Sequence, residues 1–128
     1  MTNWTTDELQ KIGNATELRI ASLRKDGTVR PYVTIWVVRA GDDIYVRSAH
    51  GTENPWYRRA KTSGEGRINA GGIERDVTFT EADQGVHADI DDAYHAKYDR
   101  YGAAIVGTVV GDKAALGTLR VVPRSLSK

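Results

Sequence analysis

The order of apolar and polar residues predicts a chain built mainly of short antiparallel strands. Residues 17–23 alternate apolar and polar side chains, as expected of a strand that is buried on one face. Residues 29–39 carry β-branched and aromatic side chains on both faces, which predicts a central strand. Turn sequences on either side of this run connect it to residues 17–23 and to a strand expected at residues 44–48. Together these segments predict an antiparallel meander.

Further strands are expected in the second half of the chain. Residues 67–70 and 73–80 flank Gly71-Gly72, which is a strong hairpin signal. Residues 117–122 are apolar and β-branched enough to predict a last strand. The total expected is therefore six strands.

Capping residues predict the helices. Thr5 followed by Glu8 is a capping box, while Asn54 and Pro55 suit an N-cap and the first helical position after it. Aspartates crowd the start of the clearest helix, and glycines end several of the segments. The expected helices are residues 5–12, a short helix that begins at Asn54, residues 89–101 and residues 103–110.

This pattern is typical of a mainly β (α+β) protein. We expect a small barrel of six antiparallel strands, with a short helix after strand 3 and a longer late helix. Barrel closure protects the strand edges that a soluble chain would otherwise expose. A length of 128 residues predicts a single domain, residues 1–128, with residues 1–13 as an appended N-terminal helix.

Composition narrows the class of protein. The chain is 40% hydrophobic, has no cysteine and carries a formal net charge of +1, which is too balanced for a dedicated nucleic-acid surface. No apolar run approaches the ~18 residues of a membrane span, and the N-terminus does not resemble a secretion signal. We therefore expect a cytoplasmic protein that does not bind nucleic acid or membranes and that acts on small molecules or pairs with a second copy.

Several common chemistries lack their sequence signatures. The three histidines have no partner at metal-ligand spacing, so no metal site is expected. There is no cysteine and no GxSxG motif for a nucleophile, and there is no GxGxxG or Walker motif for a nucleotide. The adjacent acids Asp91 and Asp92 point in different directions on a helix, which favours capping over catalysis.

A group of basic and aromatic residues carries the candidate chemistry. Guanidinium groups near the start of a helix suit a phosphate, and flat aromatic rings suit a planar ligand. Each arginine taken alone is more typically a solvated surface residue. The residues of this predicted anion cradle and its apolar wall are Arg24, Lys25, Arg30, Trp36, Arg47, Ser48, His50, Asn54, Trp56, Tyr57, Arg58 and Arg59.

Two other features, a tyrosine face and a strand arginine, each allow two interpretations. Tyr94, Tyr98 and Tyr101 share one helical face, which indicates either packing against the sheet or a ligand wall. Arg75 lies among apolar neighbours in its strand, where it either extends to solvent or to an ionic partner, or binds a ligand phosphate.

Four stretches of the chain resemble known families. They are LRKDGTVR, TIWVV, DDIYVRSAHGTENPWYRR and GRINAGGIERDVTF. These stretches are similar to the DUF2255 family of small uncharacterised proteins. The order of elements more distantly resembles the deazaflavin-dependent nitroreductases. That resemblance implies a split β-barrel like that of pyridoxamine-phosphate oxidases, usually a homodimer, with the cofactor at the barrel edge near the subunit interface.

The same resemblance implies roles for individual residues. Arg24, Lys25 and Arg30 correspond to residues that hold the phosphate-bearing tail of the cofactor, and Ser48 to a contact with its ring. The implied cofactor is a deazaflavin (coenzyme F-420) or FMN. Ser48, Tyr98 and Tyr101 are the candidate catalytic residues, through orientation of the ring or proton supply.

Three functions follow from the sequence. The first is a flavin- or deazaflavin-dependent oxidoreductase of the nitroreductase or quinone-reductase type. The second is a module that binds an anionic planar ligand without turnover. The third is a structural dimer. In the first case the cofactor supplies the hydride chemistry, and the protein supplies position and hydrogen bonds.

Overall fold

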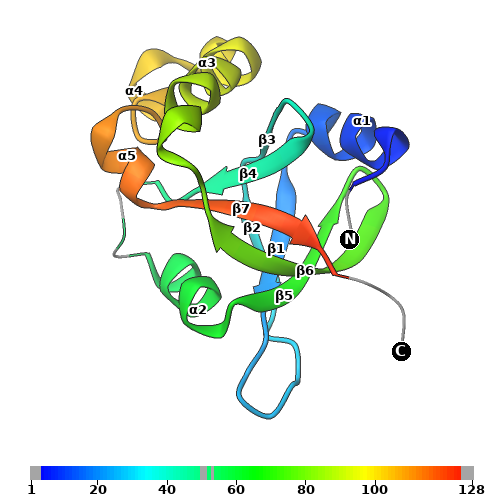
Figure 1. Cartoon of the computed structure of the whole chain (residues 1–128). Coiled ribbons are helices and arrows are strands. Elements are labelled where there is room, and N and C mark those ends of the chain that lie inside the picture. Colours follow the sequence, from blue (N-terminus) through cyan, green and yellow to red (C-terminus); the bar gives the residue numbers. More distant parts are fainter. Residues whose placement is uncertain (1–3, 50–51, 53, 125–128) are drawn as a thin grey trace.

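A single antiparallel sheet organises the computed structural model, which describes residues 4–49, 52 and 54–124. The order across the sheet is β2-β1-β5-β6-β7-β4-β3, and the sheet curls into a half-barrel (Figure 1). The α+β class is confirmed, with seven strands rather than the six expected. The strands are β1 (Leu18–Ser22), β2 (Val33–Ile35), β3 (Val38–Ala40), β4 (Asp43–Arg47), β5 (Glu65–Ala70), β6 (Ile73–Glu81) and β7 (Thr118–Pro123).

The additional strand comes from residues 29–39. The prediction of one central strand here is wrong, because the segment forms β2 and β3, which lie at opposite edges of the sheet. Trp36 and Val37 leave the ladder between them. The Val37 N–H donates to the Tyr98 hydroxyl (3.1 Å), and the Val37 carbonyl accepts from the Lys97 ammonium (2.7 Å). β1 pairs with β2 and β3 with β4 in antiparallel fashion, but this bend interrupts the expected meander.

The capping signals locate most helices correctly. The capping box of Thr5 and Glu8 is confirmed, and the helix it starts runs through Gly13. Asn54 takes the N-cap position, although its side chain makes no capping hydrogen bond within the described residues. The helix expected over residues 103–110 is only α4, and α5 was not expected. The helices are α1 (Thr6–Asn14), α2 (Pro55–Ser63), α3 (His87–Tyr98), α4 (Ala103–Val106) and α5 (Asp112–Leu116), with 3₁₀ turns η1 (Gln84–Val86) and η2 (Asp99–Tyr101).

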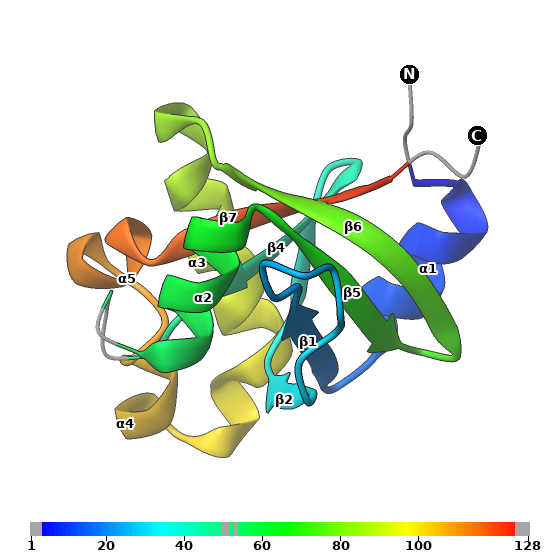
Figure 2. The same cartoon turned by 90° about the horizontal axis from the view of Figure 1, so that it is seen from below.

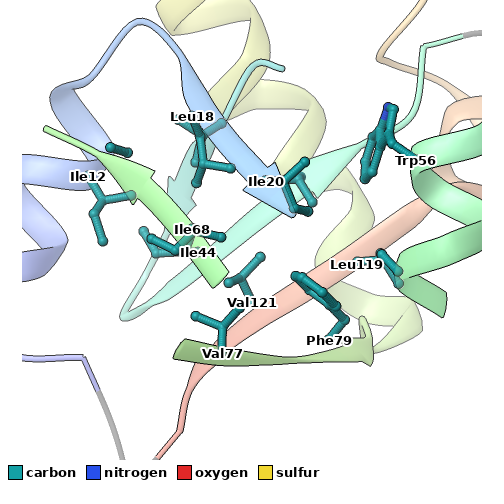
Figure 3. Packing of buried hydrophobic residues seen from close by; sticks show 14 of the residues in the cluster. Ile12, Leu18, Ile20, Ile44, Trp56, Ile68, Val77, Phe79, Leu119 and Val121 are labelled. Atoms are coloured by element: carbon teal, nitrogen blue, oxygen red, sulfur yellow. The ribbon is translucent and has the colours of Figure 1, made fainter. Parts of the chain in front are cut away.

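Apolar side chains form a core on each face of the sheet. The inner core fills the half-barrel and is closed by α1, which contributes Ile12, and by α2, which contributes Trp56 (Figure 3). The outer core lies under α3, where Tyr94 and Tyr98 pack with Val38 of β3. The packing reading of the tyrosine face is therefore confirmed for these two tyrosines. Among the described segments, no helix is long and apolar enough to span a membrane.

Arg75 is a paired residue rather than a ligand contact. Its Nη1 atom lies 2.6 Å from Glu8 Oε2, and its Nη2 donates to the Arg124 carbonyl (3.1 Å). The guanidinium carbon also lies 5.8 Å from the centre of the Trp4 ring. The ion-pair reading of Arg75 is confirmed, and this contact joins α1 to β6.

Candidate functional site

A mostly apolar cavity of about 330 Å³ lies between β2, the start of α2 and the segment after α4. We call it the tryptophan cavity, because Trp36 and Trp56 contribute its two large rings. Its polar side chains besides Arg47 are Thr34, Asn54 and Thr108. The remaining lining residues are Val33, Ile35, Ala49, Ile105 and Val109.

Trp36 is held from behind by a stack of aromatic rings. It lies parallel to Tyr98, with ring centres 4.0 Å apart, and at an angle to Tyr101, with ring centres 5.7 Å apart. The buried Tyr98 hydroxyl donates to the Thr16 carbonyl (2.7 Å) and accepts from the Val37 N–H. Burial raises the pKa of Tyr98 to about 12. Tyr98 therefore supports Trp36 and stays protonated near neutral pH.

Arg47 closes one side of the tryptophan cavity and has its charge already paired. Its side chain is fully buried and forms an ion pair with Asp91 of α3. It also donates to the Thr118 hydroxyl (2.9 Å) and to the Val109 carbonyl (2.9 Å). Nη2 lies 3.3 Å from His87 Nδ1. Because these partners occupy the guanidinium, Arg47 holds the wall of the cavity in place.

A second hollow, of about 620 Å³, lies beside the other end of α2. We call it the basic hollow, because Arg24, Lys25, Arg30, Arg58 and Arg59 all line it. None of the five forms an ion pair with a carboxylate in the part of the chain that the structure describes. The remaining lining residues are Leu23, Gly27, Thr62, Ser63 and Glu65.

Hydrogen bonds hold the 23–30 loop that carries three of these cations. Asp26 accepts from the Thr28 N–H (3.0 Å) and hydroxyl (2.7 Å), and these bonds lower the pKa of the Asp26 carboxyl. The Arg24 guanidinium donates to the Thr28 hydroxyl (3.3 Å). The Nε atom of Arg30 is buried and has no hydrogen-bond partner among the described residues. Arg75 Nε and Arg120 Nε, which line neither hollow, also lack a partner among the described residues, so the Arg30 donor is available to an acceptor but does not by itself mark a site.

The two hollows follow one another along α2. Trp56 and Asn54, at the start of the helix, line the tryptophan cavity, and Arg58 and Arg59 line the basic hollow. The segment that leads into β2 also passes from one hollow to the other. Arg30 lines the basic hollow, and Val33, which lines the tryptophan cavity, follows three residues later, about 10 Å along an extended chain. Figure 2 shows the 23–30 loop and α2 side by side. A ligand with a flat ring and an anionic tail would match this arrangement.

The family model described as an uncharacterized protein conserved in bacteria, DUF2255, matches residues 8–121. The chain is a member of the DUF2255 family. No curated protein matches this DUF2255 chain.

Solved structures share the fold of this DUF2255 protein at low identity. An F-420 reductase has a TM-score of 0.53 and 16% identity, with 92% of each chain covered. A protein described as a domain-swapped dimer has a TM-score of 0.61 and 16% identity, with 91% of this chain and 92% of that chain covered. A proposed pyridoxamine 5′-phosphate oxidase from Listeria innocua has a TM-score of 0.59 and 10% identity, with 93% and 90% covered. The expected similarity to deazaflavin-dependent enzymes and to pyridoxamine-phosphate oxidases is confirmed at the level of fold.

The DUF2255 structure separates the residues that the sequence grouped together. Trp36, Arg47, Asn54 and Trp56 meet at the tryptophan cavity, and Arg24, Lys25 and Arg30 meet at the basic hollow. Two residues of the predicted anion cradle, Ser48 and Tyr57, line neither one, and neither do the candidate catalytic residues Tyr98 and Tyr101. Ser48 is fully buried and donates to the Ala49 carbonyl (3.4 Å), and the Tyr57 hydroxyl donates to the Leu116 carbonyl (3.0 Å). His50 lies outside the described residues.

Sequence reasoning missed several lining residues of the DUF2255 cavity. Val33 and Thr34 were assigned to a central strand, where neither would border an opening. Ile105 and Thr108 follow the late helix, and no motif marks them. An apolar run at residues 103–106, followed by Gly107 and Thr108, is the signal that the sequence offers for Ile105 and Thr108.

The described residues contain no group of three or more His, Asp or Glu side chains arranged to hold a metal ion.

Proposed function

We propose that this DUF2255 protein binds a flavin-type cofactor, either FMN or the deazaflavin coenzyme F-420, and uses it as an oxidoreductase. One observation carries the proposal: an apolar cavity with two tryptophans lies directly along α2 from a hollow with five cationic side chains. The first suits a flat ring and the second suits a phosphate-bearing tail. The similar folds of an F-420 reductase and a proposed pyridoxamine 5′-phosphate oxidase support this choice of cofactor.

The residues present fit such a group. The two hollows measure about 330 and 620 Å³, within the usual range of ~300–1,000 Å³ for ligand sites. Asn54, Thr34 and Thr108 offer hydrogen bonds at the edge of the apolar cavity. The unpartnered Nε of Arg30 would gain an acceptor from an anionic tail.

When bound, the cofactor would supply the hydride chemistry. Arg24, Arg30 and Arg58 would neutralise its tail, and the tryptophans would exclude water from its ring. Arg47 is the only ionisable side chain among the described residues that line the tryptophan cavity, and it is paired with Asp91. The described lining therefore orients the reactants rather than supplying a general acid or base. Of the candidate catalytic tyrosines, Tyr98 is buried and Tyr101 is exposed beside Trp36, so we assign a contact with the substrate to Tyr101 rather than to Tyr98.

A titration of the full chain tests binding. FMN, F-420 and riboflavin, which lacks the phosphate, are each added while cofactor fluorescence is recorded. FMN and F-420 should bind at least about tenfold more tightly than riboflavin, since charge-assisted hydrogen bonds contribute about 1.5–3 kcal/mol each. Arg30→Gln should remove most of that difference, and Trp36→Leu should weaken all three ligands. Arg19→Gln, an exposed arginine that lines neither hollow, is the matched control. If none of the three ligands binds, the proposal is wrong.

Binding without turnover is the second candidate function. The lack of an acid or base in the described lining of the tryptophan cavity favours it. Oxidation of the reduced cofactor by a quinone or a nitroaromatic compound separates the two functions. Turnover that depends on Trp36 supports the oxidoreductase, whereas tight binding with no turnover supports the binding module.

A second copy of the chain would complete the site. Val33, Tyr101 and Ile105 are 38%, 45% and 52% exposed and lie around the tryptophan cavity, where β2 is an edge strand of the described sheet. A related fold is described as a domain-swapped dimer. Sedimentation at increasing protein concentration should show a homodimer, and Ile105→Glu should shift it toward the monomer. A wild-type chain that stays monomeric throughout would contradict this assembly.

A further inference from the structure

A groove between α1 and α3 lies apart from both hollows described above. It consists of two adjoining cavities of about 350 and 280 Å³, which share Gly13, Asn14, Ala96 and Lys97. No residue of the groove lines the tryptophan cavity or the basic hollow. Leu9 and Val38 contribute apolar side chains to one of the two cavities, so the groove is partly apolar and open to solvent.

Lys97 is the one amine among the described residues that line this groove. Its ammonium donates to the Val37 carbonyl (2.7 Å) and lies 5.2 Å from the centre of the Tyr98 ring. In the described part of the chain, no carboxylate forms an ion pair with it. The other charged residues that line the groove, Arg39 of β3 and Arg100 of η2, are also cations.

The partial burial of Lys97 disfavours the charged form of its amine. Burial lowers the pKa of Lys97 to about 8. About a tenth of such amines are neutral at pH 7, against fewer than about one in a thousand for a lysine of ordinary pKa. A desolvated lysine with a lowered pKa is the usual form of a nucleophilic lysine.

Two other lysines, Lys11 and Lys61, lie beside carboxylates on the surface. Lys11 lies 3.3 Å from Asp7 and Lys61 lies 3.9 Å from Glu81, and both side chains are about half exposed. Unlike Lys97, both lysines have a carboxylate partner among the described residues and a side chain that is open to solvent. Lys61 therefore serves as an internal reference for the reactivity of Lys97.

We propose that Lys97 is an acylation site, which takes an acyl group from a small acyl phosphate or thioester that enters the groove between α1 and α3. The neutral Nζ attacks the carbonyl carbon, a new N–C bond forms, and the bond from that carbon to the phosphate oxygen or the thioester sulfur breaks. The leaving group departs with the electron pair, and the proton of the amine goes to solvent. No oxidation or reduction is involved, and the proposal does not depend on cofactor binding elsewhere.

The geometry of the groove suits this reaction. Arg100 lines the groove beside Lys97 and would attract an anionic donor. The acylated nitrogen would keep one N–H, which remains available to the Val37 carbonyl. The modified chain should therefore remain folded while it loses one positive charge.

Competitive labelling of the full chain tests the proposal. The protein is incubated with acetyl phosphate, and separately with acetyl-coenzyme A, between pH 6.5 and 9.5, and acetylated peptides are quantified by mass spectrometry. At pH 7 we expect Lys97 to react about tenfold faster than Lys61 with at least one donor, because its larger neutral fraction outweighs its lower basicity. Its rate should level off above about pH 8, following the lowered pKa.

A comparison of the two donors identifies the source of the acyl group. A comparison of the labelling rates of Lys97 and Lys61 tests the proposal itself. The Lys97→Arg variant should lose the labelled peptide and keep the slow labelling of Lys61. Equal rates for Lys97 and Lys61 with both donors, across the whole pH range, would overturn the proposal. Because the assay contains no flavin, its outcome is independent of the cofactor titration.

Discussion

Position 66 has no room for a β-carbon, so only glycine fits there without a shift of the backbone. An added β-carbon would lie 2.1 Å from the carbonyl oxygen of Ala21 on the neighbouring strand and 2.8 Å from the Phe79 ring. Backbone cannot move as easily as a side chain, so we expect Gly66→Ala to lower the free energy of unfolding by about 2–4 kcal/mol. Urea denaturation measures this change. Gly85→Ala is the control, because its added β-carbon would have no described atom beyond its chain neighbours within 4 Å, and it should change stability by less than about 0.5 kcal/mol.

The pair of Glu8 and Arg75 should make stability depend on pH. Burial by itself raises the pKa of Glu8, but the Thr5 N–H and the Arg75 guanidinium more than offset it, so the net pKa lies below the ordinary 4.5. A carboxyl with a lowered pKa in the folded state stabilises the protein above pH 4.5. That contribution is lost as the pH falls through the folded-state pKa.

We therefore expect Glu8→Gln to cost about 2 kcal/mol at pH 7 and progressively less as the pH approaches 3. Urea denaturation of both proteins at several pH values measures the difference. Glu81→Gln is the control, since that side chain is 81% exposed and should change stability at pH 7 by less than about 0.5 kcal/mol. A cost for Glu8→Gln that is the same at pH 7 and pH 3 would contradict the role given to this carboxylate.

At the scale of elements, the local signals of the sequence were sufficient where contacts are local. The capping box of α1, the Gly71-Gly72 hairpin and the proline at the start of α2 depend on neighbours within a few residues. Residues 29–39 show the limit. Apolar side chains on both faces looked like one buried strand, but α3 covers Trp36 and Val38 on one face, and the half-barrel covers Val37 on the other. No pattern within the segment distinguishes these two causes of burial.

A hydroxyl of α3 helps to hold the bend between β2 and β3, together with the Lys97 ammonium. Tyr98 connects Val37 to the Thr16 carbonyl through its hydroxyl and stacks on Trp36 through its ring. Tyr98→Phe keeps the stack but leaves the buried Val37 N–H without this acceptor, so we expect a loss of about 1–3 kcal/mol in unfolding free energy. Tyr101→Phe is the matched control, because the Tyr101 ring is 45% exposed and its hydroxyl accepts only from Arg100 among the described residues. Equal effects of the two changes would show that the bend does not need this hydroxyl.

At the scale of the whole molecule, the sequence identified residue types but not their grouping. Arginines and tryptophans close in the chain were expected at one pocket edge, yet the structure distributes them between two hollows along α2. Arg47 was expected to face a ligand, and its charge is instead occupied by Asp91 from a distant helix. Such pairings depend on how α3 lies on the sheet, which follows from packing rather than from any local motif.

Asp91 provides the test of how the helical layer is joined to the sheet. Its carboxylate pairs with the fully buried Arg47 of β4 and accepts from the Gly111 N–H (3.3 Å), so it connects three separate parts of the chain. Asp91→Asn would leave the arginine charge buried without its counter-charge, and we expect a loss of about 3–5 kcal/mol in unfolding free energy. Asp92→Asn, which changes the exposed neighbouring acid, should change stability by less than about 0.5 kcal/mol.

A double variant separates the cost of the unpaired charge from other effects of changing α3. Arg47→Met combined with Asp91→Leu removes both charges, and apolar replacements for buried ion pairs are often neutral or stabilising. We expect this variant to regain much of the stability lost in Asp91→Asn. Thermal unfolding followed by near- and far-ultraviolet circular dichroism measures the difference. If Asp91→Asn is no worse than Asp92→Asn, the ion pair does not hold the helical layer. A double variant as unstable as Asp91→Asn would instead show that the polar contacts with Thr118, Val109 and Gly111 carry the stability.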